Sequence, residues 1–253
     1  MTRSPRSWLN APRMEKLCYV LWQAPGRPGD ATRDQLLGDV APRLLAAGAV
    51  RLTVDVHDAH ADFPPPLPAP PDETPIVALV SAWVGCHDFR APLEEALAGT
   101  GCRVAGYLVT ESLYTDYGDS PHGPPRDWPD GARSPGPLLV TFMEKPERLD
   151  DDAWYAHWYG RQSPMSAAIQ PRTRYVRNAV ARRLAPDAPP WRGIVEEAWP
   201  SIEHVLDPMR FYDGRGDQRR VQEHLAAMLS SVSAFLDLDR LRVVPMSEYL
   251  VRS

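Results

Sequence analysis

Residues 137–166, PLLVTFMEKPERLDDDAWYAHWYGRQSPMS, place a short apolar segment directly before an amphipathic one. The segment 137–145 carries the Leu, Val and Phe residues that are typical of a buried strand. Three aspartates at 150–152 then open a predicted helix over 151–166, where negative charge is favoured by the helix dipole. This half continues with strand candidates at 172–181 and 192–199, an interrupted helical region at 201–238 and a last strand at 241–251.

The first half of the chain repeats this order of elements. Its strand candidates are 16–24, 49–57, 75–84 and 103–112, and its helix candidates are 32–47 and 91–98. A strand–helix–strand–strand–helix–strand unit is the ferredoxin-like motif. Two such units on one chain can join their sheets. We therefore predict an α+β fold in which two ferredoxin-like βαββαβ repeats are fused into a pseudo-dimeric α/β barrel, with an internal cavity for a small ligand.

Composition divides the chain into four parts. Residues 1–15 form a polar N-terminal arm that lacks the apolar run of a signal peptide, and residues 16–116 form the first repeat. The stretch 117–136 is dominated by Gly, Pro and Asp and is predicted to be the linker, with Trp128 holding it against the surface. Residues 137–253 form the second repeat.

Two breaker-rich segments interrupt the repeats. Residues 63–75, FPPPLPAPPDETP, can form neither a helix nor a central strand, and we predict a stiff loop that covers part of the fold. Near 207–216 one proline and two glycines break the long helical region of the second half. This break is interpreted either as a lid over a cavity or as a longer connection.

The composition argues against several classes of protein. The 253 residues carry a formal net charge of −5, whereas phosphate binding needs a basic stripe, so we expect no nucleic-acid partner. No run approaches the roughly 18 apolar residues of a membrane span. The three cysteines form no disulfide or zinc motif, and we expect a cytoplasmic protein. Neither a glycine-rich nucleotide motif nor a GxSxG elbow is present.

The second half resembles the EthD family of the dimeric α/β barrel superfamily. The stretch LLVTFMEKP matches the first strand of the family and WYAHWYGRQSP matches its helix. The matching places are filled by Trp154, Trp158, Pro164, Tyr175, Val176, Asn178, Gly193, Ile194, Glu196 and Glu248. Gln162 stands where the family has a His, and a Gln side chain cannot shuttle protons. Residues 32–47 of the first half lack the aromatic–Trp–Pro series.

The resemblance implies a small-molecule protein. The family and its relatives include cofactor-independent lyases, cyclases and dehydratases of polyketide or aromatic compounds, monooxygenases that need neither metal nor flavin, haem-binding proteins and accessory proteins. Our leading hypothesis is a cofactor-independent enzyme that moves a proton on a hydrophobic, polyketide-like or aromatic substrate. The alternatives are a non-catalytic binding protein of a catabolic or biosynthetic operon and a haem-binding barrel. Fusion of the repeats permits a functional monomer and leaves a homodimer open.

One stripe of the predicted helix carries Trp154, Trp158, Arg161 and Gln162. Aromatic residues followed by a polar group suit a pocket wall that meets a flat ligand. The alternative is that both Trp residues belong to the core. His157, one residue off the stripe, is a candidate acid–base group or else a surface histidine.

Glu196 and Glu197 are neighbours on a predicted strand, so their side chains face opposite sides of the sheet. A carboxylate that faces an apolar cavity could act as a general acid or base. The resemblance favours Glu196, whereas the alternation of the strand puts Glu197 on the face with the bulky apolar residues, and both stay candidates. Tyr175 on the preceding strand is a candidate hydrogen-bonding group for a substrate oxygen.

His57, His60 and His87 follow neighbouring strands of the first half, whose ends could bring them together at a metal ion. No zinc-type spacing and no HExxH helix accompanies them. We predict loop histidines, with neither metal nor cofactor.

Overall fold

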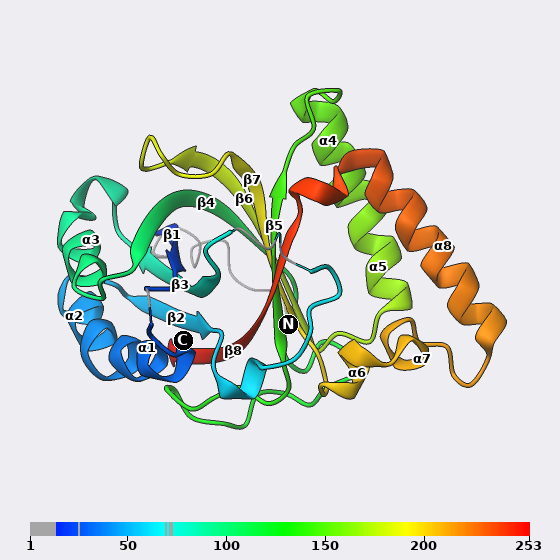
Figure 1. Ribbon diagram of the computed structural model, residues 1–253, viewed down its shortest axis with the longest axis horizontal. Coiled ribbons are helices and arrows are strands. Elements are labelled where there is room, and N and C mark those ends of the chain that lie inside the picture. The colour runs from blue at the N-terminus through cyan, green and yellow to red at the C-terminus, as the bar shows by residue number, and fades with distance from the viewer. Residues whose placement is uncertain (1–13, 25, 69, 71–72) are drawn as a thin grey trace, which may run out of the picture.

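The eight strands of the computed structural model close into one antiparallel barrel (Figure 1). The structure describes residues 14–24, 26–68, 70 and 73–253, so the predicted N-terminal arm lies almost wholly outside the described residues. The strands are β1 (Glu15–Trp22), β2 (Arg51–Val56), β3 (Ile76–Val84), β4 (Arg103–Thr115), β5 (Leu138–Glu144), β6 (Arg174–Arg183), β7 (Trp191–Ala198) and β8 (Arg242–Arg252). The predicted α+β class and the barrel are confirmed.

Each half of the chain supplies one continuous half of the barrel. The first half contributes β4-β1-β3-β2 and the second contributes β8-β5-β7-β6, with all neighbours antiparallel. Two seams join the halves, because β2 pairs with β8 and β4 pairs with β6. Every strand that the structure describes therefore has two neighbours, and closure removes the edges that would otherwise invite aggregation.

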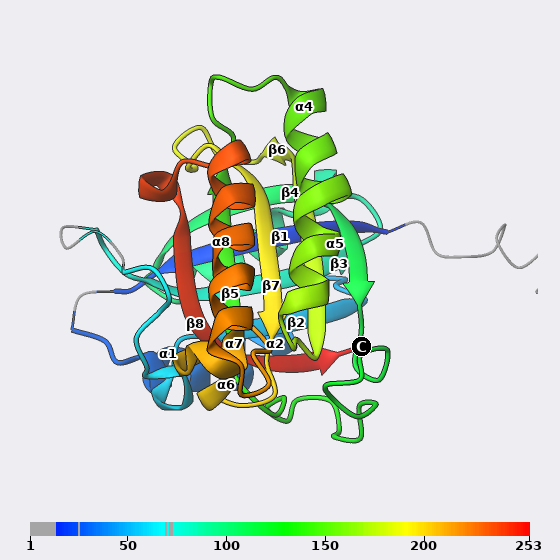
Figure 2. The ribbon, with the colours of Figure 1, turned by 90° about the vertical axis from the view of Figure 1, so that its right-hand side faces the viewer.

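The helices lie outside the barrel. In the first half α1 (Gly29–Gln35) and α2 (Ala41–Ala46) form one continuous helix, and α3 (Ala91–Ala98) precedes β4. In the second half α4 (Asp151–His157) and α5 (Ser163–Ile169) also run on continuously, and α6 (Glu203–Leu206), α7 (Pro208–Phe211) and α8 (Gln218–Phe235) precede β8. Figure 2 shows α4, α5 and α8 side by side over the outer face of β5, β7 and β8.

Both long helices contain a π-helical turn at the same place. The turn Leu36–Val40 joins α1 to α2, and the turn Trp158–Gln162 joins α4 to α5. Each turn holds a glycine four residues before a proline, in LLGDVAP and in WYGRQSP. Proline has no N–H to donate to the carbonyl four residues earlier, so one α-helical hydrogen bond is missing. A π-helical turn accommodates this gap in the hydrogen bonding. Both halves thus share a Gly-x-x-x-Pro pattern in their long helices.

The predicted helical region 201–238 forms three helices, and aspartates cap the starts of the second and the third. The side chain of Asp207 accepts a hydrogen bond from the backbone N–H of Met209 at the start of α7. Asp217 caps α8 in the same way. Between them Asp213 and Arg215 have φ values of 46° and 52°, which turn the chain back toward the barrel.

The interior of the barrel is filled by side chains. At one end Trp191 stacks on Trp22 with the ring centroids 5.9 Å apart, and its centroid lies 4.4 Å from that of Phe142. Further apolar side chains and a group of buried charged residues, among them Lys16 and Glu196, fill other parts of the interior. We predicted an internal cavity, whereas the apolar cavity described below lies outside the barrel wall, under the second-half helices.

The segment 117–136 is attached to the barrel by several contacts. The hydroxyls of Tyr117 and Ser134 donate to a carboxylate oxygen of Glu248 at 2.7 and 2.6 Å. The ring of Trp128 meets that of Tyr117, in the same segment, edge-on at 4.8 Å. In the described part of the chain, no helix is both long and apolar enough to cross a membrane.

Candidate functional site

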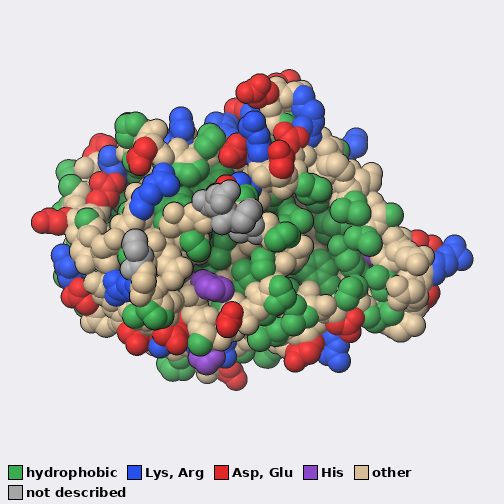
Figure 3. All heavy atoms as spheres, in the orientation of Figure 1, with side chains coloured by type: hydrophobic (Ala, Val, Ile, Leu, Met, Phe, Trp, Pro, Cys, Tyr) green, Lys and Arg blue, Asp and Glu red, His purple; other side chains and the backbone are tan. Residues whose placement is uncertain are grey.

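A cavity of about 340 Å³ lies between the outer face of the second-half sheet and the helices that cover it. Its apolar lining comes from α8, from the strands and from the two breaker segments: Leu225, Met228, Leu229 and Val232; Leu139, Met143, Val195 and Val243; Pro66 and Leu67; Phe211 and Tyr212. Figure 3 shows hydrophobic side chains gathered around this hollow. The proline-rich loop and the 207–216 break thus both border the cavity.

Strand alternation explains this lining. On β5 the side chains of Leu139 and Met143 point to the helices, while Val140 and Phe142 between them point into the barrel. The cavity is open to solvent on the α8 side, since the lining residue Leu229 is 50 % exposed. An exposed apolar surface of this kind is typical of a binding site.

One end of the cavity is polar. Glu197 on β7 faces the cavity and forms an ion pair with Arg172. The guanidinium of Arg172 also donates to Ser166 Oγ at 2.9 Å and lies 4.0 Å above the ring of Tyr175. These contacts hold the Glu197 carboxylate at the boundary between the apolar lining and the polar residues.

Tyr175 lies beside this ion pair with its hydroxyl 3.1 Å from Ser163 Oγ. The hydrogen of Ser163 is directed to the carbonyl oxygen of Trp158 at 2.9 Å, so Tyr175 donates and Ser163 accepts. Burial raises the pKa of the Tyr175 phenol above its usual value, and Glu197 adds to the rise despite the opposing charge of Arg172. Tyr175 is therefore neutral, and its hydroxyl hydrogen is already used in the hydrogen bond to Ser163.

Gln162 also lines the cavity, in the π-turn of the long helix. Its Nε2 lies 3.2 Å from the sulfur of Met228. Its Oε1 is buried and has no hydrogen-bond partner in the described structure. A buried acceptor without a donor costs about 1–3 kcal/mol, so a ligand that brings a donor to this oxygen gains that amount.

The other helix candidates lie elsewhere. His157 Nε2 is 3.0 Å from Ser231 Oγ of α8, and the imidazole stacks on Phe235. Burial, and next the charge of Arg161, lower the pKa of His157. Neither His157 nor the exposed Arg161 lines the cavity. Trp154 is fully buried behind Trp158, which leaves only Trp158 and Gln162 of the predicted stripe in the wall.

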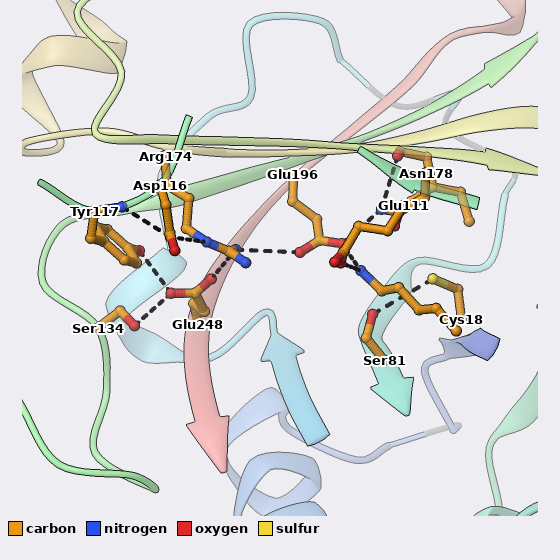
Figure 4. Close-up of polar contacts among 12 residues, drawn as sticks. Cys18, Ser81, Glu111, Asp116, Tyr117, Ser134, Arg174, Asn178, Glu196 and Glu248 are labelled. Atoms are coloured by element: carbon orange, nitrogen blue, oxygen red, sulfur yellow. Dashed lines mark hydrogen bonds and ion pairs between the residues drawn. The ribbon is translucent and has the colours of Figure 1, made fainter. Parts of the chain in front are cut away.

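Glu196 faces the interior of the barrel, where it belongs to a buried charge network (Figure 4). Lys16 Nζ lies 3.2 Å from Glu196 and 2.8 Å from Glu111, and Asn178 donates to Glu196 at 2.8 Å. Burial alone would raise the pKa of Glu196, but the charges of Lys16 and Arg174 outweigh burial and lower it. Glu196 is thus a structural anion rather than a cavity group.

The network continues to Glu248 on the last strand. Arg174 Nη1 lies 2.7 Å from Glu248 and 3.6 Å from Glu196, so one guanidinium links two buried carboxylates. The linker hydroxyls of Tyr117 and Ser134 complete the shell of Glu248. The sequence resemblance singled out Glu196 and Glu248, yet it gave no sign that a cation links them.

Asp55 on β2 is opposite Glu248 in the seam and is fully buried. Neither of its carboxyl oxygens has a hydrogen-bond partner in the described structure. Burial, and next the charges of Glu196 and Glu248, raise the pKa of Asp55 well above its ordinary value of 3.8. The folded protein therefore favours the neutral, protonated form of the Asp55 carboxyl.

Asp55→Asn is expected to stabilise the protein increasingly as the pH rises. Because the folded-state pKa is raised, the Asp55 contribution to stability is present below the ordinary carboxyl pKa and is lost as the pH rises through the folded-state pKa. Each pKa unit corresponds to about 1.4 kcal/mol. Urea unfolding at about pH 4 and about pH 8 tests this: equal stabilities at the lower pH and a more stable variant at the higher pH are expected, and a variant that is weaker at both pH values contradicts it.

The three first-half histidines do not meet. His57 ends β2 and its Nδ1 contacts the carbonyl oxygen of Pro245, whereas His87 follows the far end of β3. Because β2 and β3 are antiparallel, with Val56 paired to Ala78 and Arg51 to Trp83, these positions lie at opposite ends of the barrel. The idea of a shared metal site is therefore wrong for this set of histidines.

No protein-family model and no curated protein matches this sequence. Among solved structures, an anthrone oxidase-like protein aligns with a TM-score of 0.54 and 11 % identity over 96 % of this chain and 94 % of its own. A monooxygenase-like protein from Lactobacillus acidophilus NCFM aligns with a TM-score of 0.47 and 9 % identity over 93 % of this chain and 94 % of its own. A mutant chlorite dismutase from Candidatus Nitrospira defluvii aligns with a TM-score of 0.46 and 7 % identity over 97 % of this chain and 95 % of its own.

Identities this low describe the fold alone. The chain has the α+β barrel fold of dimeric α/β barrel proteins, with the barrel closed by the two halves of one polypeptide. The cavity under the second-half helices is its candidate functional site.

The residues of the cavity do not fit haem ligation by histidine. Such ligation needs an imidazole that reaches the iron, and no histidine lines the cavity in the part of the chain that the structure describes. His157, the nearest candidate on the long helix, is engaged by Ser231 and Phe235.

Proposed function

We propose that this protein is an enzyme that binds a neutral, flat, hydroxyl-bearing aromatic or polyketide-like molecule in the second-half cavity and removes a proton from it with Glu197. One observation carries the proposal: a carboxylate lies at the polar end of an otherwise apolar cavity of about 340 Å³. General-base catalysis by a positioned carboxylate is an established use of such a group.

The free hydrogen-bonding capacity of the cavity supports this ligand class. Gln162 Oε1 has no donor, and the Glu197 carboxylate can only accept. Two of the five N–H groups of Arg172 are directed to Glu197 and Ser166. A ligand that brings hydroxyl hydrogens satisfies these acceptors, whereas a carboxylate ligand would meet Glu197 with a like charge.

The expected chemistry uses the chain's own groups. Glu197 accepts a proton from a phenolic or enolic hydroxyl, or from a carbon next to a carbonyl, and becomes a carboxylic acid. Arg172 keeps the carboxylate oriented before the transfer, and its charge favours the anion left on the substrate. Trp158 and the apolar residues of α8 hold the ring system in place and keep water away from it.

Matched ligand pairs test the ligand class. A naphthol or a hydroxylated polycyclic compound is expected to bind about tenfold or more tightly than its methyl ether, because the ether cannot satisfy Gln162 Oε1. Quenching of tryptophan fluorescence, with Trp158 in the wall, reports binding. In Gln162→Met, which removes this acceptor at similar size, the preference should shrink, and Glu197 remains as the other acceptor. Equal affinity of phenol and ether for the unaltered protein contradicts this ligand class.

A non-catalytic binding protein is the second candidate. The Glu197 carboxylate is already engaged by the ion pair with Arg172, and Gln162 takes the place of the family His. A compound that binds tightly and is recovered unchanged after prolonged incubation would favour this reading over catalysis.

We also infer that the two halves are ferredoxin-like repeats and that the second is related to the EthD family. The equivalent strand orders β4-β1-β3-β2 and β8-β5-β7-β6 support the duplication. The Gly-x-x-x-Pro π-turns in both long helices add to it. Trp154, Trp158 and Pro164 support the relation to EthD proteins through their spacing.

A further inference from the structure

Three potential metal ligands meet where β1 begins and β3 ends. Glu15 opens β1 and is paired with Val84, the last residue of β3. Two residues further on, the chain places Cys86 and His87 beside it. One ligand atom from each of Glu15, Cys86 and His87 lies within 4.8 Å of the other two. The antiparallel pairing of β1 and β3 creates this group from residues more than 70 positions apart.

We propose that Glu15, Cys86 and His87 form a binding site for a zinc-class divalent cation. The donor set is a thiol, an imidazole and a carboxylate, which is the chemistry that Zn²⁺ prefers. Hard cations such as Mg²⁺ and Ca²⁺ take oxygen ligands and do not suit it. The site is distinct from the second-half cavity and independent of the proposed function.

Two contacts show that the group is partly organised for a cation. Glu15 Oε2 accepts hydrogen bonds from the backbone N–H of His87 at 2.6 Å and lies 2.9 Å from His87 Nδ1. The other ring nitrogen, Nε2, is buried without a hydrogen-bond partner in the described structure and lies 3.6 Å from Asp88 Oδ1. Metal-ligating carboxylates and imidazoles are commonly held by such hydrogen bonds.

The geometry requires only side-chain adjustment. Zinc bonds of about 2.0–2.3 Å in a tetrahedral site place the ligand atoms roughly 3.3–3.7 Å apart. The ligand atoms of Glu15, Cys86 and His87 already lie within 4.8 Å of one another, and Cys86 is a free, partly exposed thiol. A bound cation would fasten the start of β1 to the connection between β3 and α3.

Cobalt titration of the untagged, metal-free protein tests the proposal. One equivalent of Co²⁺ is expected to give tetrahedral d–d bands in the visible and a thiolate-to-cobalt charge-transfer band in the near ultraviolet, and Zn²⁺ should displace it. Cys86→Ser is expected to lose the charge-transfer band. His87→Gln should weaken Co²⁺ binding by roughly tenfold or more, since even outer-shell partners of a metal contribute 10–100-fold.

Cys102→Ser is the matched control and should bind cobalt as the unaltered protein does, because Cys102 lies outside the group. If a variant fails to fold, protection of Cys86 from alkylation by Zn²⁺ in the unaltered protein gives the same answer. Absence of a charge-transfer band, or alkylation of Cys86 at an unchanged rate with Zn²⁺ present, would overturn the proposal.

Discussion

Replacing Glu197 by Gln is expected to lower kcat by about 10²–10⁴-fold, the usual contribution of a positioned general base. The substitution keeps the size of the side chain and one oxygen acceptor, so affinity for a hydroxyl-bearing ligand should change only a few-fold. The amide cannot take up a proton at neutral pH, and the proposed transfer then has no acceptor. Steady-state kinetics and fluorescence titration on one compound separate the two effects.

His157→Ala is the matched comparison. His157 has the conventional acid–base side chain of this helix, yet it contacts Ser231 and Phe235 and does not line the cavity. Its replacement should leave kcat within about threefold of the original, as expected for a change that makes no transition-state contact. Loss of turnover in His157→Ala with full turnover in Glu197→Gln would reverse the assignment.

Arg174→Met is expected to destabilise the fold by about 3–5 kcal/mol, because removing one partner of a buried ion pair leaves an uncompensated charge. Arg174 is 6 % exposed, contacts Glu248 at 2.7 Å and lies 3.6 Å from Glu196. Without it, two buried carboxylates and Asp55 share the interior with Lys16 as the remaining nearby cation. The midpoint of urea unfolding, followed by far-ultraviolet circular dichroism, measures the loss.

Two further variants serve as controls for the Arg174→Met measurement. Arg219→Met removes an exposed partner of Glu223 and should cost no more than about 0.5 kcal/mol, as surface pairs on helices do. Combining Arg174→Met with Glu248→Gln removes both charges of the buried pair and should recover part of the loss. If Arg174→Met alone is as mild as Arg219→Met, the network does not hold the barrel interior together.

The local sequence pattern was sufficient to predict most of the helices and strands. The predicted strand at 75–84 appears as Ile76–Val84, and the predicted helix at 91–98 appears as Ala91–Ala98. The alternation of β7 also put Glu197 on the bulky face, and the structure has it beside the cavity-lining Val195. These features depend on neighbours two to four positions apart, which a sequence displays directly.

The candidate site was harder to predict because its parts come from distant segments. The cavity joins the proline-rich loop, the 207–216 break and four strands, and its position outside the barrel follows from how tightly aromatic and charged residues fill the interior. His157 and Trp158 are adjacent in sequence, yet only Trp158 reaches the cavity, because α8 covers His157. That Gln162 Oε1 is an unused acceptor at the polar end of the cavity likewise follows only from the hydrogen bonds of the folded structure.

By itself the sequence determined the order of the elements, their repetition in two halves and the face on which each strand residue lies, since all three follow from short-range periodicity. Only the tertiary structure decided that Glu196 is tied to Lys16 and Arg174 while Glu197 faces a ligand cavity, and that Glu15 meets His87. The physical reason is barrel closure: pairing across the seams brings charges from distant strands together, and their burial, rather than their spacing along the chain, sets what each can do.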